Sequence, residues 1–270
     1  LANGHPVIAE NKVGAGGAIA MAQLKSMAGN PHWMGTFHTG GIAGAASGLI
    51  KTDLREFVPV AMMVEETSVV AVRGDSHIKS GADLVNALKA DPTKLRIAVA
   101  PALGQNTHVA IAKPLKVAGV AVDKLTIAPF RSSGESVTAL LGGHVDVVSA
   151  TAPVVLPFVA EGKLRIIATA AAEHGTGPLA QVKTWREQGV PADYVSYNGV
   201  LLTPGVNADQ IRYWEAALRK IALSKDWINL VEKSGNKPIF RGYVDSYRYL
   251  SDEWLAAHEL AASLGLKGNK

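Results

Sequence analysis

Short runs of β-branched and apolar residues alternate with amphipathic segments along most of the chain. The runs 58–64 (VPVAMMV) and 164–170 (LRIIATA) predict buried strands. Between such runs lie segments with apolar residues at helical spacing, such as 207–222, where Trp214 and Leu218 share one face. Strands that alternate with helices are typical of an α/β fold with largely parallel sheets. We therefore expect that fold class.

The same patterns place the individual elements. We expect strands at 5–10, 33–36, 58–64, 68–72, 95–100, 124–127, 145–149, 164–170 and 195–202. We expect helices at 18–28, 81–90, from about 108, at 133–141, 153–161, from 207, at 226–233 and at 245–264. Capping signals support three starts, at Ser80, Thr184 and Asn207.

The length of 270 residues fits two sheets better than one. The extended runs 58–72 and 195–202 are not followed promptly by a helix, so we interpret them as crossovers between domains. Residues 1–68 and 197–270 then form a discontinuous first domain, and residues 69–196 form an inserted second domain. Two α/β domains joined by two strands predict a hinge with a cleft for a ligand.

Composition excludes several classes of protein. Hydrophobic residues make up 48% of the chain, enough for packed cores and too many for a disordered protein. There is no cysteine, so disulfides, thiolate nucleophiles and cysteine-ligated zinc are excluded. No two of the eight histidines lie three to five residues apart, so we expect no metal and no other cofactor. The net charge of +4 favours anionic partners, but no Lys/Arg run suggests nucleic acid.

Catalytic patterns are scarce. The adjacent pair Glu65 and Glu66 would point to opposite faces of a strand, so the two carboxylates cannot act together. The turn Gly14–Gly17 invites a dinucleotide interpretation, but Ile19 stands where the fingerprint needs a small residue. A nucleotide-dependent α/β enzyme that uses this turn stays open as an alternative. A second alternative is the effector-sensing domain of a transcription regulator.

Three polar loops follow predicted strands. The most informative is 100–108, where Gly104, Gln105 and Asn106 precede a helix start. Unpaired N–H groups at such a start favour a carboxylate. His108, at the end of that loop, is also a candidate for ligand contact or for bracing the loop. The loops 35–41 and 130–134 are similar, the latter with Arg131 as its cation.

Four stretches identify a family resemblance: 7–17 (VIAENKVGAGG), 56–61 (EFVPVA), 139–146 (ALLGGHVD) and 199–205 (GVLLTPG). The chain resembles the solute-binding receptors of the tripartite tricarboxylate transporter family, also called Bug or TctC-like proteins. The resemblance covers essentially the whole chain in the right order. Family members carry a signal peptide and a first strand before the point where this sequence starts.

The resemblance implies a two-domain periplasmic binding protein fold of the type II kind, with two hinge crossovers and an interdomain ligand cleft. It implies capture of a small carboxylate, either a di- or tricarboxylate or an aromatic carboxylate. The solute would be delivered to a membrane permease without chemistry, so the protein would be no enzyme. We further expect a periplasmic monomer that binds no nucleic acid.

The family's ligand loops fall on two segments of this chain, and neighbouring strand ends add further candidates. The candidate ligand residues are Thr36, Phe37, His38, Ser68, Gly104, Gln105, Asn106, Ser132, Ser133, Thr151 and Tyr197. The family usually has Thr or Ser at 105 and 106, a small polar residue at 37 and Trp at 197. It often has an acid or amide where this chain has Ala150 and Thr151, which argues against an amino acid as the ligand.

Overall fold

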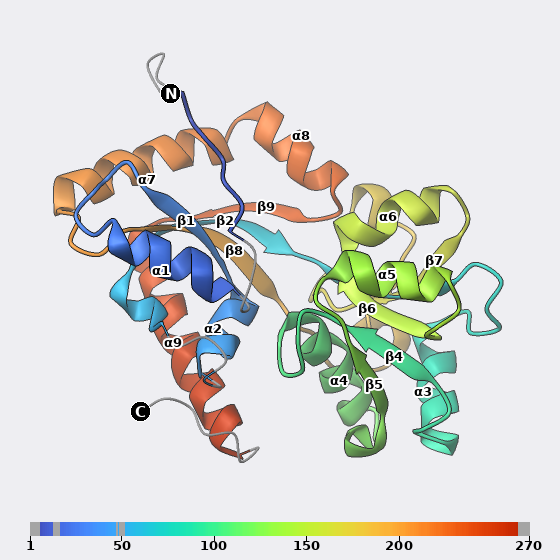
Figure 1. Ribbon diagram of the computed structural model, residues 1–270. Helices are drawn as coiled ribbons and strands as arrows, with labels where there is room; N and C mark the ends of the chain where they lie inside the picture. Colours follow the sequence, from blue (N-terminus) through green and yellow to red (C-terminus); the bar gives the residue numbers. More distant parts are fainter. Residues whose placement is uncertain (1–5, 13–16, 47, 49–51, 264–270) are drawn as a thin grey trace. The chain divides into compact units, whose positions relative to one another are not determined.

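The computed structural model describes residues 6–12, 17–46, 48 and 52–263 (Figure 1). The chain divides into two compact units. Unit 1 comprises Leu1–Val64, Tyr197–Ile228 and Pro238–Lys270, and unit 2 comprises Glu65–Ser196 and Asn229–Lys237. The sequence placed the borders at 68/69 and 196/197 and assigned all of 197–270 to the first domain. The differences are residues 65–68 and residues 229–237, which both belong to unit 2.

Three contacts tie that segment to unit 2. The side-chain oxygen of Asn236 accepts the Thr67 N–H at 3.0 Å. Gly235 has φ +76° and packs so closely that an added Cβ would lie 2.8 Å from Leu156 Cδ1. Lys237 pairs with Glu173 at 3.0 Å. The described chain therefore passes between the units at 64/65, 196/197, 228/229 and 237/238, and not only at the two predicted crossovers.

Unit 1 is built on a four-stranded sheet with the order β1-β8-β2-β9. Its strands are β1 (Met34–His38), β2 (Val58–Glu66), β8 (Ser196–Leu202) and β9 (Lys237–Arg241). Its helices are α1 (Ala18–Ser26), α2 (Thr39–Ala46), α7 (Ala208–Ala222) and α9 (Tyr243–Ser263), while α8 (Lys225–Lys233) begins in unit 1 and ends in unit 2. β1 runs antiparallel to β8, from Met34 opposite Leu202 to His38 opposite Asn198.

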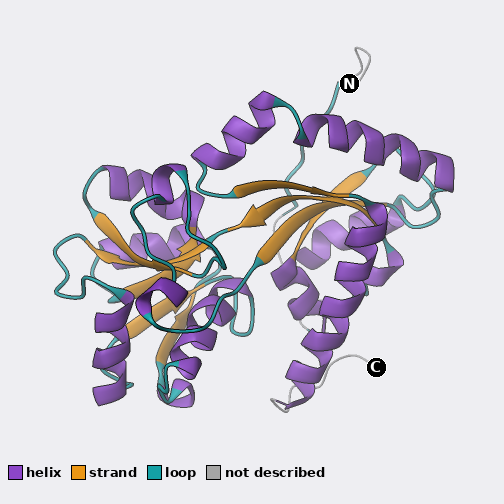
Figure 2. Cartoon of the chain, turned by 180° about the vertical axis from the view of Figure 1, so that it is seen from behind, coloured by secondary structure: helices purple, strands orange, loops and turns teal. Residues whose placement is uncertain are grey.

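Each face of this sheet buries its own hydrophobic cluster. On one face, Met62 and Leu201 pack with apolar residues of α1, α2 and α9, such as Ile42 and Leu250. On the other face, Met63 and Leu202 pack with apolar residues of α7 such as Leu218, and Figures 1 and 2 show α7 on the side of the sheet opposite α1 and α9. Removal of these apolar side chains from water stabilises the fold by about 25 cal/mol per Å² of buried apolar surface and is the main stabilising contribution. Asn207 starts α7 with a reciprocal capping box to Gln210, as the sequence predicts.

Unit 2 is built on a five-stranded sheet with the order β5-β4-β6-β3-β7. Its strands are β3 (Ser68–Arg73), β4 (Arg96–Val99), β5 (Thr126–Pro129), β6 (Val147–Thr151) and β7 (Leu164–Thr169). Its helices are α3 (Gly81–Ala90), α4 (Asn106–Val117), α5 (Ser133–Leu141) and α6 (Ala152–Ala160). α3 and α4 cover one face and α5 and α6 the other (Figure 1).

The expectation of largely parallel sheets is wrong in part. β4 is parallel to both β5 and β6, but β3 is antiparallel to β6 and to β7. β3 enters unit 2 directly from β2 without an intervening helix, so it has no crossover to turn it parallel. β1 is likewise antiparallel to β8.

Other local predictions also differ from the structure. Residues 6–10 form no strand. Residue 5 and residues 14–16 of the predicted turn Gly14–Gly17 lie outside the described residues. Thr184 and Glu187 make the predicted capping box, but only a short 3-10 turn, Arg186–Gln188, follows. The helix α2 and the strand β9 were not predicted.

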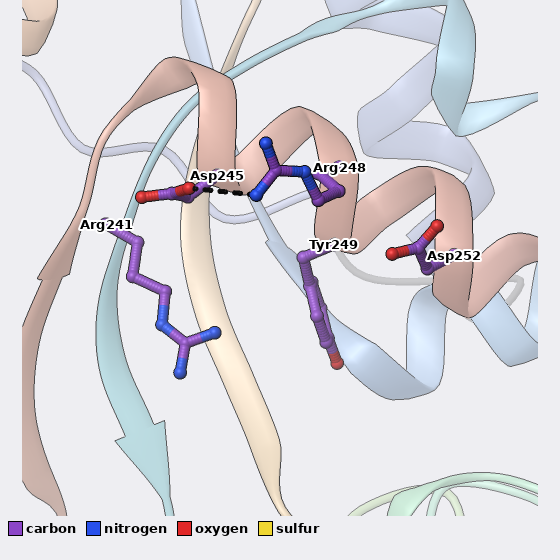
Figure 3. Close-up of a pocket in the computed structure, with 5 residues that line it drawn as sticks. All are labelled: Arg241, Asp245, Arg248, Tyr249 and Asp252. Atoms are coloured by element: carbon purple, nitrogen blue, oxygen red, sulfur yellow. Dashed lines mark ion pairs between the residues drawn. The ribbon is translucent and has the colours of Figure 1, made fainter.

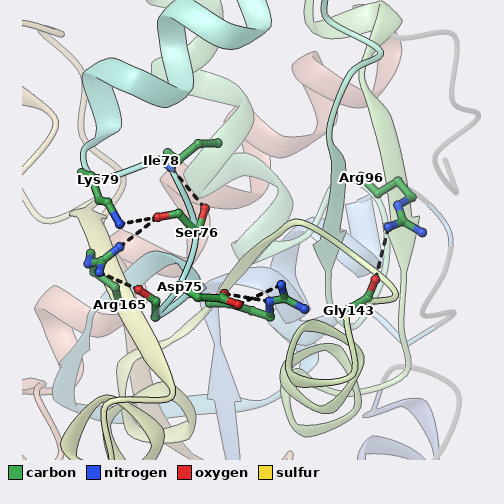
Figure 4. A network of polar contacts seen from close by, with 9 residues as sticks. Asp75, Ser76, Ile78, Lys79, Arg96, Gly143 and Arg165 are labelled. Atoms are coloured by element: carbon green, nitrogen blue, oxygen red, sulfur yellow. Dashed lines mark hydrogen bonds and ion pairs between the residues drawn. The ribbon is translucent and has the colours of Figure 1, made fainter.

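Side chains at one end of the unit 2 sheet fasten loops to one another. Arg165 donates to the Gly74 carbonyl at 2.6 Å, and Arg96 donates to the Gly143 carbonyl (Figure 4). Arg96 also pairs with Asp146. These arginines are engaged by the protein itself. Separately, none of the described helices combines the length and the apolarity that a bilayer crossing requires.

Candidate functional site

One edge of the unit 2 sheet gathers most of the predicted ligand residues. β4, β5, β6 and β7 end at this edge and β3 begins there, because β3 is antiparallel to its two neighbours. Ligands of open α/β sheets bind outside the carboxyl ends of the strands. We call this edge, with the segments 100–108 and 130–133 that extend it, the carboxyl edge.

Gln105 is the most unusual side chain of the carboxyl edge. It is the residue before α4, it is only 2% exposed, and it makes no side-chain capping bond. Neither its amide nitrogen nor its amide oxygen has a hydrogen-bond partner among the described residues. Burying an unpaired polar group costs on the order of 1–3 kcal/mol. Folding alone therefore does not account for an amide at this place.

Two further buried hydroxyls at the carboxyl edge share this property. In the described part of the chain, buried side-chain atoms without a partner occur on Ser68, Gln105, Thr169, Trp185 and Trp227. Three of these five residues lie at the carboxyl edge. Ser68 pairs with Thr151 across β3 and β6, and this pair shares a sheet face with Val70 and Ser149. α4 packs on that face, since Ser149 bonds to the Thr107 carbonyl.

Asn106 braces the loop on both sides. Its amide nitrogen donates to Ser196 Oγ at 3.0 Å and to Glu66 at 3.4 Å. Its amide oxygen accepts from the Tyr194 hydroxyl at 3.0 Å. The residue is 6% exposed. These bonds hold the start of α4 to the two chain segments at the borders of unit 2, so Asn106 positions its neighbour Gln105.

Thr107 and His108 fix the loop in front of α4. The Thr107 hydroxyl donates to the Ala100 carbonyl at 2.7 Å and accepts the Ala100 N–H at 2.9 Å. His108 Nδ1 accepts the Gly104 N–H at 2.8 Å, and burial lowers the pKa of this imidazole. Gly104 has φ +81°, a left-handed conformation that favours glycine.

The remaining predicted residues of unit 2 lie at the carboxyl edge with clear local roles. Ser132 caps α5 by accepting the Glu135 N–H at 3.2 Å, and Ser133 is half-buried next to it. Thr151 ends β6 half-buried and makes no capping bond to α6. Arg131 is exposed. The side chains at the carboxyl edge that could contact a ligand are thus mostly neutral hydrogen-bond donors and acceptors.

In unit 1 the predicted loop 35–41 is the end of a strand and the start of a helix. Thr36 is exposed on β1, and Phe37 is 3% exposed in the core, where it fills the space beside Gly199. The Phe37 ring packs in the core of unit 1, and its contact with the ligand stays a prediction. His38 Nδ1 accepts the Gly41 N–H at 3.2 Å and so caps α2; burial lowers its pKa.

Tyr197 belongs to a polar cluster at the start of β8. Its N–H donates to Thr39 Oγ1 at 2.8 Å, and Thr39 shares a hydrogen bond of 2.7 Å with the Tyr249 hydroxyl. The rings of Tyr197 and Tyr249 meet edge to face at 5.0 Å. Arg241 lies 4.7 Å over the Tyr197 ring and donates to its hydroxyl at 3.1 Å.

Sequence reasoning missed Thr169, Thr39, Tyr249 and Arg241. Only Thr169 carried a signal, as a polar residue at the end of an apolar strand. The other three come together from distant segments. No group of three metal-ligating side chains occurs within the described ranges.

The protein-family comparison matches residues 2–266 to the model described as the tripartite tricarboxylate transporter family receptor, TctC. The chain belongs to this receptor family. The resemblance seen in the sequence is thereby confirmed. The family consists of solute-binding receptors and not of enzymes, so the nucleotide-dependent enzyme is set aside.

Relatives and solved structures agree with this receptor fold. The receptor is 26% identical to Protein BugT of Bordetella pertussis over 255 residues, which cover 93% of this chain and 77% of BugT. MatC of Rhodopseudomonas palustris, solved with bound malate, matches with a TM-score of 0.81 and 22% identity over 96% of this chain and 89% of MatC. Another R. palustris protein, solved with adipate, matches with a TM-score of 0.83 and 21% identity over 94% and 85% of the two chains.

Proposed function

We propose that this receptor binds a small dicarboxylate at the carboxyl edge of unit 2 and delivers it to the membrane permease of a tripartite tricarboxylate-type transporter. The observation that carries the proposal is the Gln105 amide, which is buried at the start of α4 and has no partner among the described residues. Its amide N–H groups would donate to a carboxylate oxygen. A bound ligand thus offsets the cost of burying the amide.

The chemistry of the carboxyl edge favours an anion. The first N–H groups of α4 have no partner inside the helix and carry a partial positive charge, which stabilises an adjacent anion by about 0.3–1 kcal/mol, more when partly buried. The Ser68 hydroxyl lies on the sheet face that α4 covers and has no hydrogen-bond partner in the described structure. Neutral donors fixed by the fold need little reorganisation when a carboxylate arrives.

Known structures with the same fold support two carboxylates on the ligand. Malate and adipate, bound in the two R. palustris proteins, are both dicarboxylates. Thr151 stands where an acid or amide is frequent in the family, so an α-amino group on a ligand here would have no anionic partner at that position. We therefore favour plain dicarboxylates over amino acids at the carboxyl edge.

Family membership supports the remaining parts of the proposal. The family model describes a transporter receptor, and such receptors work in the periplasm. We propose that this protein does so as a monomer, with the permease as its partner. Size-exclusion chromatography with light scattering would test the oligomeric state, and a pull-down with the permease subunits would test delivery.

The binding experiment is a thermal-shift screen followed by calorimetry. Malate, succinate, adipate, citrate, benzoate and aspartate are the probes. We expect the dicarboxylates to raise the melting temperature most, because a ligand at 100 times its dissociation constant adds about 2.7 kcal/mol. Stabilisation by aspartate or benzoate alone would contradict the dicarboxylate assignment, and a response to none of the probes would contradict carboxylate capture.

A matched pair of variants then locates the site. Gln105→Met removes the buried amide, and Gln181→Met makes the same change at an exposed position of unit 2. We expect the first to lose dicarboxylate affinity and the second to keep it. Equal dicarboxylate affinities in both variants would show that the Gln105 amide at the start of α4 does not contact the ligand.

A further inference from the structure

Unit 1 carries a pocket of its own, of about 380 Å³, between the end of β9 and the first turns of α9. It is lined by Arg241, Asp245, Arg248, Tyr249 and Asp252 (Figure 3). This volume lies within the range of small-molecule sites, ~300–1,000 Å³. None of these residues belongs to the carboxyl edge, which lies in unit 2.

The charges of the pocket reduce to one cation and one anion. Asp245 and Arg248 form an ion pair at 3.7 Å and neutralise each other. The Asp252 carboxylate, which is exposed on α9, makes no hydrogen bond or ion pair with the described residues. The Arg241 guanidinium has no carboxylate partner among them either, since its hydrogen bond goes to the Tyr197 hydroxyl. The pocket therefore offers one guanidinium and one carboxylate for a ligand.

The guanidinium of Arg241 is held ready for an anion. It lies 4.7 Å from the centre of the Tyr197 ring and donates one of its five N–H groups to the Tyr197 hydroxyl. The other N–H groups keep the planar fork that matches a carboxylate. Tyr197 is itself fixed by its contacts to Thr39 and Tyr249, so the orientation of the guanidinium follows from the fold.

Tyr249 separates the two unpaired charges. In Figure 3 its ring lies between the Arg241 guanidinium and the Asp252 carboxylate. Its hydroxyl is engaged with Thr39 at 2.7 Å, and burial raises the Tyr249 pKa, so the phenol stays neutral. A ligand that lies across this ring would meet a cation at one end and an anion at the other.

We propose that this pocket is a second binding site, which takes a small zwitterion with a carboxylate toward Arg241 and an ammonium group toward Asp252. All five lining residues belong to unit 1, whereas the proposed dicarboxylate site is built from residues of unit 2. A ligand with only one of the two charges would leave either Arg241 or Asp252 without a counterion and would bind more weakly.

The test is calorimetry on the full chain in the Gln105→Met background, which removes the carboxyl-edge amide from the measurement. Glycine, β-alanine, γ-aminobutyrate and ε-aminocaproate vary the spacing of the charges, while butyrate and butylamine each lack one charge. We expect at least one zwitterion to bind roughly fivefold or more tightly than either single-charge probe. Equal binding of butyrate or butylamine, or no binding of any zwitterion, would overturn the proposal.

Variants assign the two ends of the ligand. Arg241→Gln and Asp252→Asn should each weaken zwitterion binding roughly fivefold. The double variant Arg241→Glu with Asp252→Lys should restore it, because the ligand can bind in reverse. Arg212→Gln, at an exposed Arg of α7 paired with Asp209, is the control and should change nothing. Unchanged binding in both single variants, with melting temperatures intact, would also overturn the proposal. Dicarboxylate binding by the unmodified protein would be unaffected by either result.

Discussion

Replacing Gln105 by methionine should make the ligand-free receptor more stable while it loses its ligand. Methionine has nearly the shape of glutamine but no polar atoms. Gln105 is 2% exposed, and neither polar atom of its side chain has a partner in the described structure. Removing an unpaired buried polar group of this kind is worth roughly 1–3 kcal/mol. For a chain of this size that raises the melting temperature by roughly 2–4 °C for each kcal/mol.

The assay compares melting temperatures with and without a saturating dicarboxylate. We expect the ligand-free variant to melt above the unmodified protein, and the ligand to stabilise only the unmodified protein, by about 2.7 kcal/mol at 100 times its dissociation constant. Gln181→Met should change neither measurement. A ligand-free variant that melts lower would show that the amide stabilises the fold, and the reasoning would then be refuted.

Three further predictions concern the parts that shape the two units. His38→Asn keeps an acceptor for the Gly41 N–H at the start of α2 but has no titrating group. Burial lowers the His38 pKa in the folded protein, so the stabilisation by neutral His38 is complete above about pH 6.5 and declines as the pH falls through the lower folded pKa. We therefore expect the variant to lose less stability on acidification than the unmodified protein. Thr107→Val leaves the Ala100 N–H and C=O without their hydrogen-bond partner. We expect each lost bond to lower the free energy of unfolding, measured in urea, by roughly 1–3 kcal/mol. Gly199→Ala places a Cβ 2.4 Å from Phe37 and should cost about 1–3 kcal/mol by calorimetry.

Each of these predictions has a contrary result. Parallel pH profiles for His38→Asn and the unmodified protein would show that His38 does not titrate between the two states. A Thr107→Val variant as stable as the unmodified protein would mean that the loop finds other partners. A neutral Gly199→Ala would mean that β1 and β8 can move apart locally.

The sequence predicts the elements best where a local signal and the tertiary role agree. Helix α5 occupies the predicted range because Ser132 caps it and Gly142 and Gly143 follow it. Strands β2, β3 and β7 match to within a few residues because their apolar runs are buried in the sheets. The two-sheet fold and the receptor family are likewise confirmed.

The misses share one physical cause, which is that they depend on contacts between distant segments. The helix α2 consists of Thr, Gly, Ala and Ile, a weak helix sequence that is stabilised by packing against α9 and by the His38 cap. Local patterns also cannot show which polar residues are already engaged. Gln105 and Asn106 are chemically alike neighbours, but only the structure shows that Asn106 is tied to Ser196 while Gln105 is not.

The return of residues 229–237 to unit 2 has a consequence for protein engineering. A fragment cut at 65 and 196 would contain every strand of the unit 2 sheet but would lack Asn236, the acceptor for the Thr67 N–H, and Gly235, which packs on Leu156. A fragment that keeps these contacts of unit 2 must therefore include residues 229–237, joined to residues 65–196 by a linker. A chimera that exchanges unit 2 between related receptors likewise requires both segments, 65–196 and 229–237, to be exchanged together.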